Sequence, residues 1–172
     1  MRPRASERLA GLPGDDLVPS PDAVMDRAFD LPVPPEAVWP WFGQLGKNRA
    51  GWYLPAWVET FVPRRRRALR HIDPSLQGLR PGDVIDDWGG RDATFEIVVH
   101  DAPHVLVHRS TRGHLSISWA IRLSSEGSGT RVHLRFRIGG VKRPWLVVYG
   151  GGLIDLLTVA GLAAGLRERV RI

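Results

Sequence analysis

Cysteine is absent from the 172-residue sequence. Its absence excludes disulfide bonds, thiol nucleophiles and thiolate metal sites, and it suits a reducing compartment, so we expect a cytoplasmic location. The sequence also lacks the glycine-rich loops that bind phosphate groups and the GxSxG motif of serine hydrolases. The six histidines are scattered and have no partner carboxylate at ligand spacing, so we expect neither a metal ion nor a cofactor.

Acidic residues are in the minority, since 18 Asp and Glu stand against 24 Lys and Arg and the formal net charge is +6. A basic balance of this kind attracts polyanions without specificity. The strongest basic run, Arg64–Arg67, has no interleaved aromatic residues that could stack on bases. We therefore expect a solvated loop and no specific nucleic-acid partner, while docking of this run on anionic lipid stays open.

The first 22 residues lack the apolar stretch of a secretory signal peptide. They are rich in proline, glycine and charged residues, a composition typical of a mobile segment. The chain is short enough for a single domain. We therefore predict a flexible N-terminal arm over residues 1–22 and one domain over residues 23–172.

Alternating apolar residues and turn signals predict a mainly antiparallel sheet. The segment VMDRAFDLPV predicts a first strand that ends at Pro32, and a short strand is placed at Asp83–Asp87. Four further runs form a meander: Ala93–Asp101, Val105–Thr111, Leu115–Ser124 and Thr130–Ile138. Between the first two strands, helical spacing in PPEAVWPWFGQLG predicts a helix that Pro40 should bend or split, and GWYLPAWVETF predicts a second short helix.

Charge pairing fixes the register of the meander, because one arrangement gives a clean apolar face and a clean polar face together. In this arrangement Glu96 lies opposite Arg109. The apolar face holds Phe95, Ile97, Val99, Leu106, His108, Ser110, Leu115, Ile117, Trp119, Ile121, Leu123, Val132, Leu134, Phe136 and Ile138. If the first strand pairs with the last, Asp26 and Asp30 lie beside Arg131, Arg135 and Arg137. An ion-pair ladder is the favoured interpretation of that surface, and a phosphate-binding surface is the alternative.

The C-terminal segment from Pro144 to Leu166 is long and apolar enough to form a transmembrane helix. Asp155 and the run Gly150–Gly152 count against a span. A long helix laid across the apolar face of the sheet is favoured, and membrane association through this helix, peripheral or spanning, is the alternative.

Several motifs between Ala23 and Val170 carry a family resemblance, namely VWPWFGQLGKNRAGWYLPAWVE, IDPSLQGLRPGD, SWAIRL, GTRVHLRFR and AGLRERV. They resemble the SRPBCC superfamily, which includes START-like, Bet v 1-like and polyketide cyclase/dehydratase-like proteins, and within it a mainly bacterial group. The resemblance implies an α+β helix-grip fold, in which a curved antiparallel sheet wraps around a long C-terminal helix and two short helices follow the first strand. It also implies a cavity that holds a hydrophobic or aromatic small molecule.

Three functions follow as hypotheses. The first is binding or transport of an apolar or aromatic small molecule, or lipid, between the sheet and the C-terminal helix. The second is a polyketide cyclase/dehydratase-like enzyme, so an enzymatic activity stays uncertain. The third is a membrane-associated protein. The chain is expected to be a monomer or a homodimer.

The catalytic candidates are His108, Arg49 and Tyr53. His108 and Ser110 are polar residues sent inward by the register, and Arg49 in the loop NRAGWY could clamp a carboxylate or phenolate at the cavity mouth. The alternatives are a structural histidine bonded to the backbone, and a salt bridge from Arg49 to Glu59 or Asp83. The ligand-binding candidates are Trp41, Trp52, Tyr53, Trp57, Trp88, Phe95, Ile97, His108, Ser110, Ile117, Trp119, Leu134 and Phe136. Core packing is the alternative for each aromatic residue.

Overall fold

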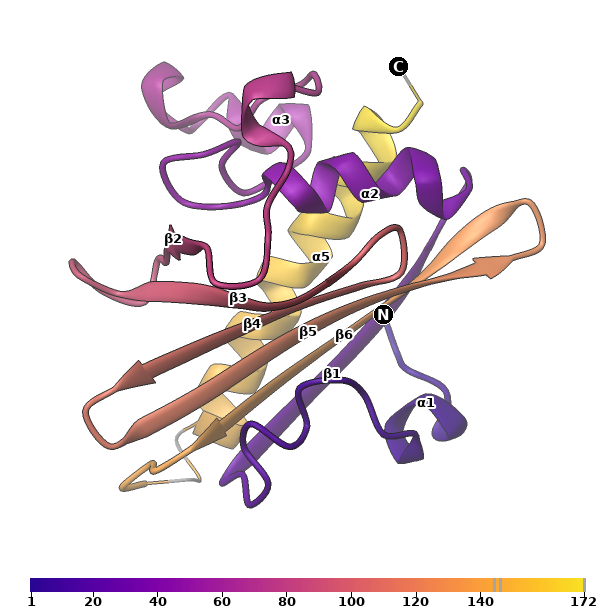
Figure 1. The fold of residues 1–172 in the computed structure, drawn as a ribbon. Coiled ribbons are helices and arrows are strands. Elements are labelled where there is room, and N and C mark those ends of the chain that lie inside the picture. Colours follow the sequence, from indigo (N-terminus) through magenta and orange to yellow (C-terminus); the bar gives the residue numbers. More distant parts are fainter. Residues whose placement is uncertain (144, 146, 172) are drawn as a thin grey trace.

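A six-stranded antiparallel sheet forms the centre of the computed structural model, which describes residues 1–143, 145 and 147–171. The strand order is β1-β6-β5-β4-β3-β2. The strands are β1 (Ala23–Leu31), β2 (Val84–Asp86), β3 (Thr94–Asp101), β4 (Val105–Arg112), β5 (Leu115–Glu126) and β6 (Gly129–Gly139). Figure 1 shows the sheet as one layer, with helices on one face and the N-terminal segment on the other.

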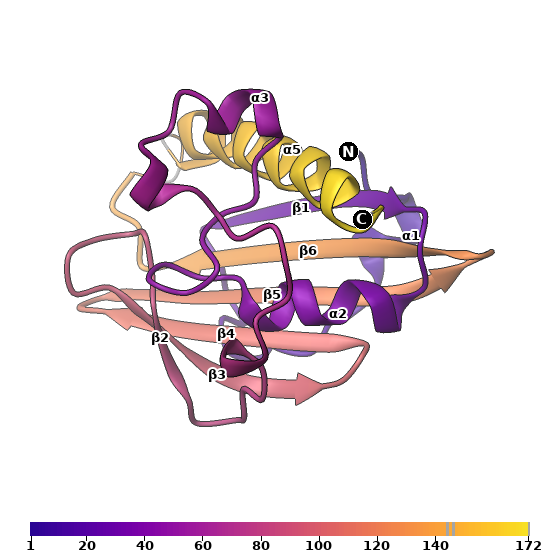
Figure 2. The same ribbon diagram turned by 90° about the horizontal axis from the view of Figure 1, so that it is seen from above.

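The helices confirm the predicted α+β, helix-grip arrangement. They are α1 (Ala5–Leu9), α2 (Pro35–Gln44), α3 (Ala56–Glu59) and α5 (Gly152–Arg169), with the short turns η1 (Arg64–Arg66), η2 (Pro74–Leu76) and η3 (Val147–Gly151). Helices α2 and α5 lie across the same face of the sheet, and α3 lies beside α5 (Figure 2). Of the predicted C-terminal segment, Pro144 and Leu146 lie outside the described residues.

Helix α2 begins with Pro35, whose fixed backbone angle suits the first helical position. Of the two predicted effects of Pro40, bending or splitting the helix, the split does not occur, because α2 continues through this residue to Gln44. A proline at this place removes one hydrogen bond, to the carbonyl of Glu36. Glu36 is exposed, so water can reach this part of the helix.

The two faces of the sheet carry the side chains predicted for them, although Leu123 lies opposite Val132 and not opposite Thr130, a shift of two residues that keeps every side chain of β5 and β6 on its face. Glu96 lies opposite Arg109, with 2.8 Å between its Oε2 and the arginine Nη2. Val99 is the exception, because the register of β3 and β4 shifts between Ile97 and Val99. Val99 therefore joins the apolar cluster on the outer face, and His100 takes the inner side, 5.1 Å from Trp39 between ring centroids.

The main core lies between the inner face of the sheet and the helices. The C-terminal half of α5 enters this core through Val159, Leu162, Ala163 and Leu166. At Gly165 the helix meets the backbone of Tyr53 so closely that an added Cβ would lie 2.6 Å from its carbonyl carbon. The absence of a side chain at this position therefore sets the distance between α5 and the loop before α3.

Residues 1–22 pack along the outer face of the sheet, where the composition had predicted a mobile arm. Leu12 and Val18 are buried there. The arginines of β6 hold the segment: Arg131 pairs with Glu7 at 2.7 Å, and Arg135 pairs with Asp15 at 2.8 Å. The composition of the segment does not reveal this packing, because the complementary charges lie more than 100 residues further along the chain.

The acidic side of β1 completes the outer face. As predicted, Asp26 lies opposite Arg135 and Asp30 opposite Arg131, at 2.9 Å and 3.1 Å between charged atoms. His133 also lies 2.7 Å from Asp26. Burial tends to raise the pKa of Asp26, but the hydrogen bonds with His133 and Arg135 bring it below its ordinary value. The arrangement is the ion-pair ladder of the favoured interpretation.

Candidate functional site

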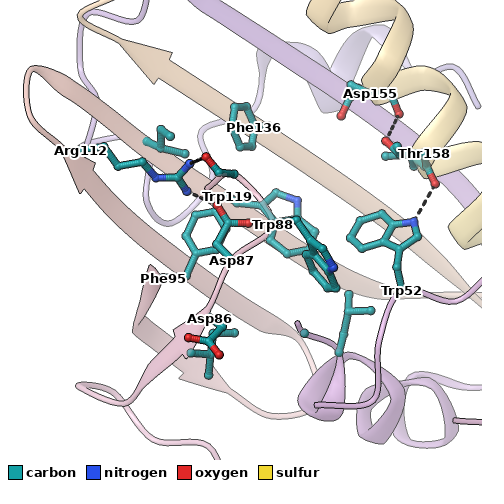
Figure 3. A pocket seen from close by; sticks show the side chains of 16 residues that line it. Trp52, Asp86, Asp87, Trp88, Phe95, Arg112, Trp119, Phe136, Asp155 and Thr158 are labelled. Atoms are coloured by element: carbon teal, nitrogen blue, oxygen red, sulfur yellow. Dashed lines mark hydrogen bonds and ion pairs between the residues drawn. The ribbon is translucent and has the colours of Figure 1, made fainter. Parts of the chain in front are cut away.

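A pocket of about 270 Å³ opens between the inner face of the sheet and the N-terminal half of α5 (Figure 3). Its walls are mostly aromatic and aliphatic. The lining residues are Leu45, Gly46, Trp52, Ile85, Asp86, Asp87, Trp88, Gly89, Phe95, Arg112, Ile117, Trp119, Phe136, Asp155, Thr158 and Val159.

Four apolar strand residues of the pocket lie on the inner face of the sheet, as their alternation along the strands predicts. Phe95 comes from β3, Ile117 and Trp119 from β5, and Phe136 from β6. The β5–β6 register places Trp119 directly opposite Phe136. The strand pattern alone therefore brings these four side chains to one wall.

Trp52 connects the opposite wall to helix α5. Its indole nitrogen donates a hydrogen bond of 3.1 Å to the carbonyl of Thr158. Its ring stands edge-on to Trp88, with 5.5 Å between centroids, and stacks on Trp119 at 6.1 Å. Three tryptophans from three separate segments thus meet around the pocket, and such ring pairs favour each other beyond their buried area.

An ion pair between Asp87 and Arg112 forms a polar edge of the pocket. Arg112 also donates 3.0 Å to the hydroxyl of Ser110 and lies over the ring of Phe95, 5.6 Å from its centroid. Lys47 donates to the carbonyls of Asp87 and Gly90, each at 3.1 Å. The loop that carries Trp88 is therefore held from two sides.

Asp155 is the second polar group of the pocket, on the first turn of α5. Its Oδ2 lies 2.9 Å from Nε of Arg27 on β1. Burial raises the pKa of Asp155, and the charge of Arg27 opposes this rise. Neighbouring Thr158 donates its hydroxyl to backbone carbonyls of its own helix. In the part of the chain that the structure describes, no three His, Asp or Glu side chains gather closely enough to hold a metal ion.

His108 lies behind the pocket wall, outside the lining. It is 2% exposed, and its ring stacks on Trp119 with 4.9 Å between centroids. Burial lowers its pKa to about 4, so the imidazole is neutral at neutral pH. Its Nδ1 lies 3.3 Å from the carbonyl of Trp119, which matches the alternative of a structural histidine.

Arg49 and Tyr53 also lie outside the lining. Arg49 donates to the carbonyls of Gly43 and Leu76, at 3.0 Å and 2.6 Å, and the described residues hold no salt bridge from it to Glu59 or Asp83. Tyr53 is fully buried and donates 2.9 Å to the carbonyl of Trp41. Burial raises the pKa of Tyr53 above its ordinary value. Both side chains brace the loop between α2 and α3.

The predicted ligand-binding residues fall into three groups. Those that line the pocket are Trp52, Trp88, Phe95, Ile117, Trp119 and Phe136. Those buried elsewhere are Trp41, Tyr53, Ile97, His108, Ser110 and Leu134. Trp57 stands apart, since it is 69% exposed on α3.

Arg112 and Asp155 are lining residues that the sequence reasoning did not propose. Arg112 follows His108 and Ser110 at alternate positions, so it continues the inward face, but the predicted strand ended at Thr111. Helical spacing places Asp155 and Thr158 on one polar stripe of the C-terminal segment, but it does not indicate that this stripe lines a pocket. A strand extended by one residue would have found Arg112.

Comparisons with known proteins give solved structures of similar fold. No protein-family profile and no curated protein matches the chain. Protein NE0264 from Nitrosomonas europaea is 15% identical, covers 87% of this chain and 95% of its own, and superposes with a TM-score of 0.57. CalU16 from Micromonospora echinospora is 18% identical, with 86% and 83% covered and a TM-score of 0.54. Protein CV1439 from Chromobacterium violaceum is 14% identical, with 87% and 97% covered and a TM-score of 0.54.

The fold is of the helix-grip type. At these identities the likeness extends to the fold alone, and it leaves the contents of the pocket to be argued from the pocket itself.

Proposed function

We propose that the protein binds or carries a small apolar or aromatic molecule in the pocket between the sheet and α5. The observation that supports this is the meeting of Trp52, Trp88 and Trp119 with Phe95 and Phe136 around an open space of about 270 Å³. Ligand sites are concave, mostly apolar, and supplied with a few polar groups. The motifs that resemble the SRPBCC superfamily agree with this proposal, since cavities in that superfamily commonly hold such molecules.

The polar groups at the pocket would orient the guest. Arg112 and Asp87 lie at one edge, and Asp155 lies on the side formed by α5. Asp87 and Asp155 are already paired with arginines, and the third lining carboxylate, Asp86, accepts a hydrogen bond of 2.7 Å from Asn48. A ligand therefore gains most by burying apolar surface and least by adding charge. A guest with one or two rings and a single hydrogen-bonding group fits this distribution.

Binding of the neutral fluorescent probe N-phenyl-1-naphthylamine tests the proposal. Loss of the Trp119 ring should weaken binding roughly tenfold or more, because it removes a stacked wall of the pocket. The matched control is Trp57→Ala, which removes the same type of ring from an exposed position outside the pocket and should leave binding unchanged. Circular dichroism would check that both variants are folded.

A milder variant keeps the proposal testable if Trp119→Ala does not fold. Phe136→Leu keeps an apolar side chain and should weaken binding of the probe several-fold. The proposal is overturned if the wild-type protein does not bind the probe, or if Trp119→Ala and Trp57→Ala behave alike.

A cyclase/dehydratase-like activity is the second candidate, and it would need an acid–base group at the pocket. Asp155 is the group that favours it, because its raised pKa makes it a better proton donor near neutral pH than an ordinary carboxyl. His108, Arg49 and Tyr53 lie outside the lining. Asp155→Asn should then abolish turnover of a polyketide-like substrate while the neutral probe still binds, whereas loss of probe binding would contradict this role.

A further inference from the structure

The N-terminal half of α5, with the turn η3 and Trp145 before it, carries an unusual amount of exposed apolar surface. The residues concerned, here called the apolar ridge, are Trp145, Val148, Tyr149, Leu153, Ile154 and Leu157. Their exposed fractions run from 49% to 78%. Soluble proteins rarely leave large apolar side chains clustered in this way unless the surface meets a partner or a membrane.

The burial of this helix differs from that of an ordinary core helix. The segment Val147–Arg169 is long and apolar enough to cross a membrane, and only 17% of its most apolar stretch is buried. Its C-terminal half nevertheless belongs to the core, where Leu162 and Leu166 are fully buried. The same helix therefore has one half held by the protein and one half uncovered.

Contacts to the sheet and to the loop before α3 hold the uncovered half in place. Arg27 on β1 lies 2.9 Å from the carboxylate of Asp155 and donates 2.8 Å to the carbonyl of Gly152. Trp52 donates to Thr158 one turn further on. A membrane span would have to break these contacts and pull Leu162 and Leu166 out of the core. The geometry fits a helix that lies on a membrane surface.

Basic residues beside the apolar ridge indicate what kind of surface it would bind. Lys142 and Arg143 are exposed and directly precede the ridge, and the first acidic residue after them is Asp155, which turns toward Arg27. Trp145 and Tyr149 stand at the same end, and rings with one polar group are typical of the membrane–water boundary. Basic residues beside an apolar helix face are the features of peripheral binding to anionic lipid.

We propose that the apolar ridge docks on the surface of a bilayer that contains anionic phospholipid, with Lys142 and Arg143 at the headgroups. This goes beyond the proposed ligand binding and stands without it. Asp155, Thr158 and Val159 of the same helix line the pocket, so docking brings the pocket close to the bilayer.

Vesicle flotation of the full chain tests the proposal. Vesicles of phosphatidylcholine with phosphatidylglycerol should float the wild-type protein, and vesicles of phosphatidylcholine alone should bind it less. The variant Leu153→Gln/Ile154→Gln/Leu157→Gln should bind the mixed vesicles roughly tenfold more weakly or worse, because three exposed apolar side chains no longer enter the lipid. These positions are exposed, so the substitutions should leave the fold intact.

Two further variants test whether vesicle binding depends on the position of the apolar residues and on the basic pair. Leu9→Gln/Val84→Gln changes apolar residues that are 87% and 63% exposed on α1 and β2, and it should float like the wild type. Lys142→Gln/Arg143→Gln should lower binding to the mixed vesicles and reduce its dependence on salt.

Three results would overturn the proposal. The first is absence of flotation, or flotation that the ridge variant does not weaken. The second is resistance to extraction from membranes by alkaline carbonate, which would indicate a span. The third is a dimer that the ridge substitutions dissociate, without vesicle binding, which would make a second copy the partner of the ridge.

Discussion

At the level of single residues, His108 shows what burial does to a titratable group. It stacks on Trp119 and meets the edge of Phe95, with little access to water. The charged imidazolium would lose its hydration there, so the folded protein favours the neutral form. Its place behind the aromatic wall makes it a support for Trp119.

This burial predicts a loss of stability in mild acid. The pKa of His108 is about 4 in the folded protein against 6.5 as its ordinary value, so the unfolded chain binds more protons between these pH values. The free energy of unfolding should therefore fall as the pH drops from 6.5 toward 4, by at most about 3 kcal/mol. Urea unfolding at pH 7 and pH 5 would measure it.

Two variants isolate the contribution of His108. His108→Leu should flatten the pH dependence between pH 7 and pH 5, whatever it does to stability at pH 7. His114→Gln removes an exposed histidine and should keep the wild-type slope. Equal slopes in the wild type and His108→Leu would contradict the assignment.

The candidate site could be predicted in part at this scale. Alternation along the strands placed Phe95, Ile117, Trp119 and Phe136 on one face, and all four line the pocket. Alternation does not apply to the aromatic residues of the loop and helices, so it could not tell lining residues from exposed ones there. Trp52 lines the pocket, whereas Trp57 faces solvent. Nothing in the local pattern distinguishes Trp52 from Trp57, because both lie in the segment that is predicted as one short helix, whereas only Ala56–Glu59 is helical in the structure.

At the level of elements, two of the three glycines in α5 have opposite roles. Gly165 faces the backbone of Tyr53 and Leu54, where an added Cβ would lie 2.6 Å and 2.7 Å from backbone atoms. Gly152 lies near the start of the same helix and has open space where a Cβ would stand. One glycine sets a close contact, and the other only adds flexibility to the helix.

Substitution of each glycine by alanine should separate these roles. Gly165→Ala should destabilise the protein by about 1–3 kcal/mol or more, because backbone atoms cannot move aside as a flexible side chain can. Gly152→Ala should be neutral or stabilising by up to about 1 kcal/mol, since alanine is the better helix former. Thermal unfolding of the two variants would decide, and equal melting temperatures would contradict the assigned contact.

The elements themselves were the most predictable part of the structure. Period-two alternation and the Glu96–Arg109 pair gave the sheet faces, because a slip by one residue would have exposed the apolar set. The shift after Ile97 was missed, since no glycine or turn residue marks it in the run of Val98, Val99 and His100. Hydropathy identified the C-terminal helix but could not tell which half is covered, because that depends on residues from distant elements.

At the level of the whole molecule, the N-terminal segment and the outer face of the sheet form one charge network. Glu7 accepts two hydrogen bonds from Arg131, at 2.7 Å and 2.9 Å. These bonds lower the pKa of Glu7 to about 2, although partial burial opposes the shift. Paired bonds between a guanidinium and a carboxylate are among the stronger polar contacts in proteins.

Removal of this carboxylate should loosen the segment without unfolding the sheet. Glu7→Gln should increase tryptic cleavage after Arg8 at neutral pH, roughly three- to tenfold, because local opening becomes easier. Asp16→Asn changes an exposed acidic residue of the same segment and should cleave at the wild-type rate. Unchanged cleavage of Glu7→Gln would show that the apolar contacts of Leu12 and Val18 suffice to hold the segment.

The N-terminal segment on the outer face also affects how polyanion binding by a shortened chain should be interpreted. A protein that begins at Ala23 would keep Asp26 and Asp30 but lose Glu7 and Asp15, the partners that the first 22 residues supply to Arg131 and Arg135. Its sheet would then expose a basic strip in which Arg131 and Arg135 each keep one carboxylate partner, Asp30 and Asp26, and lose the other. Binding of such a fragment to nucleic acid or heparin would be a consequence of the truncation. In the full chain, the N-terminal segment covers these arginines.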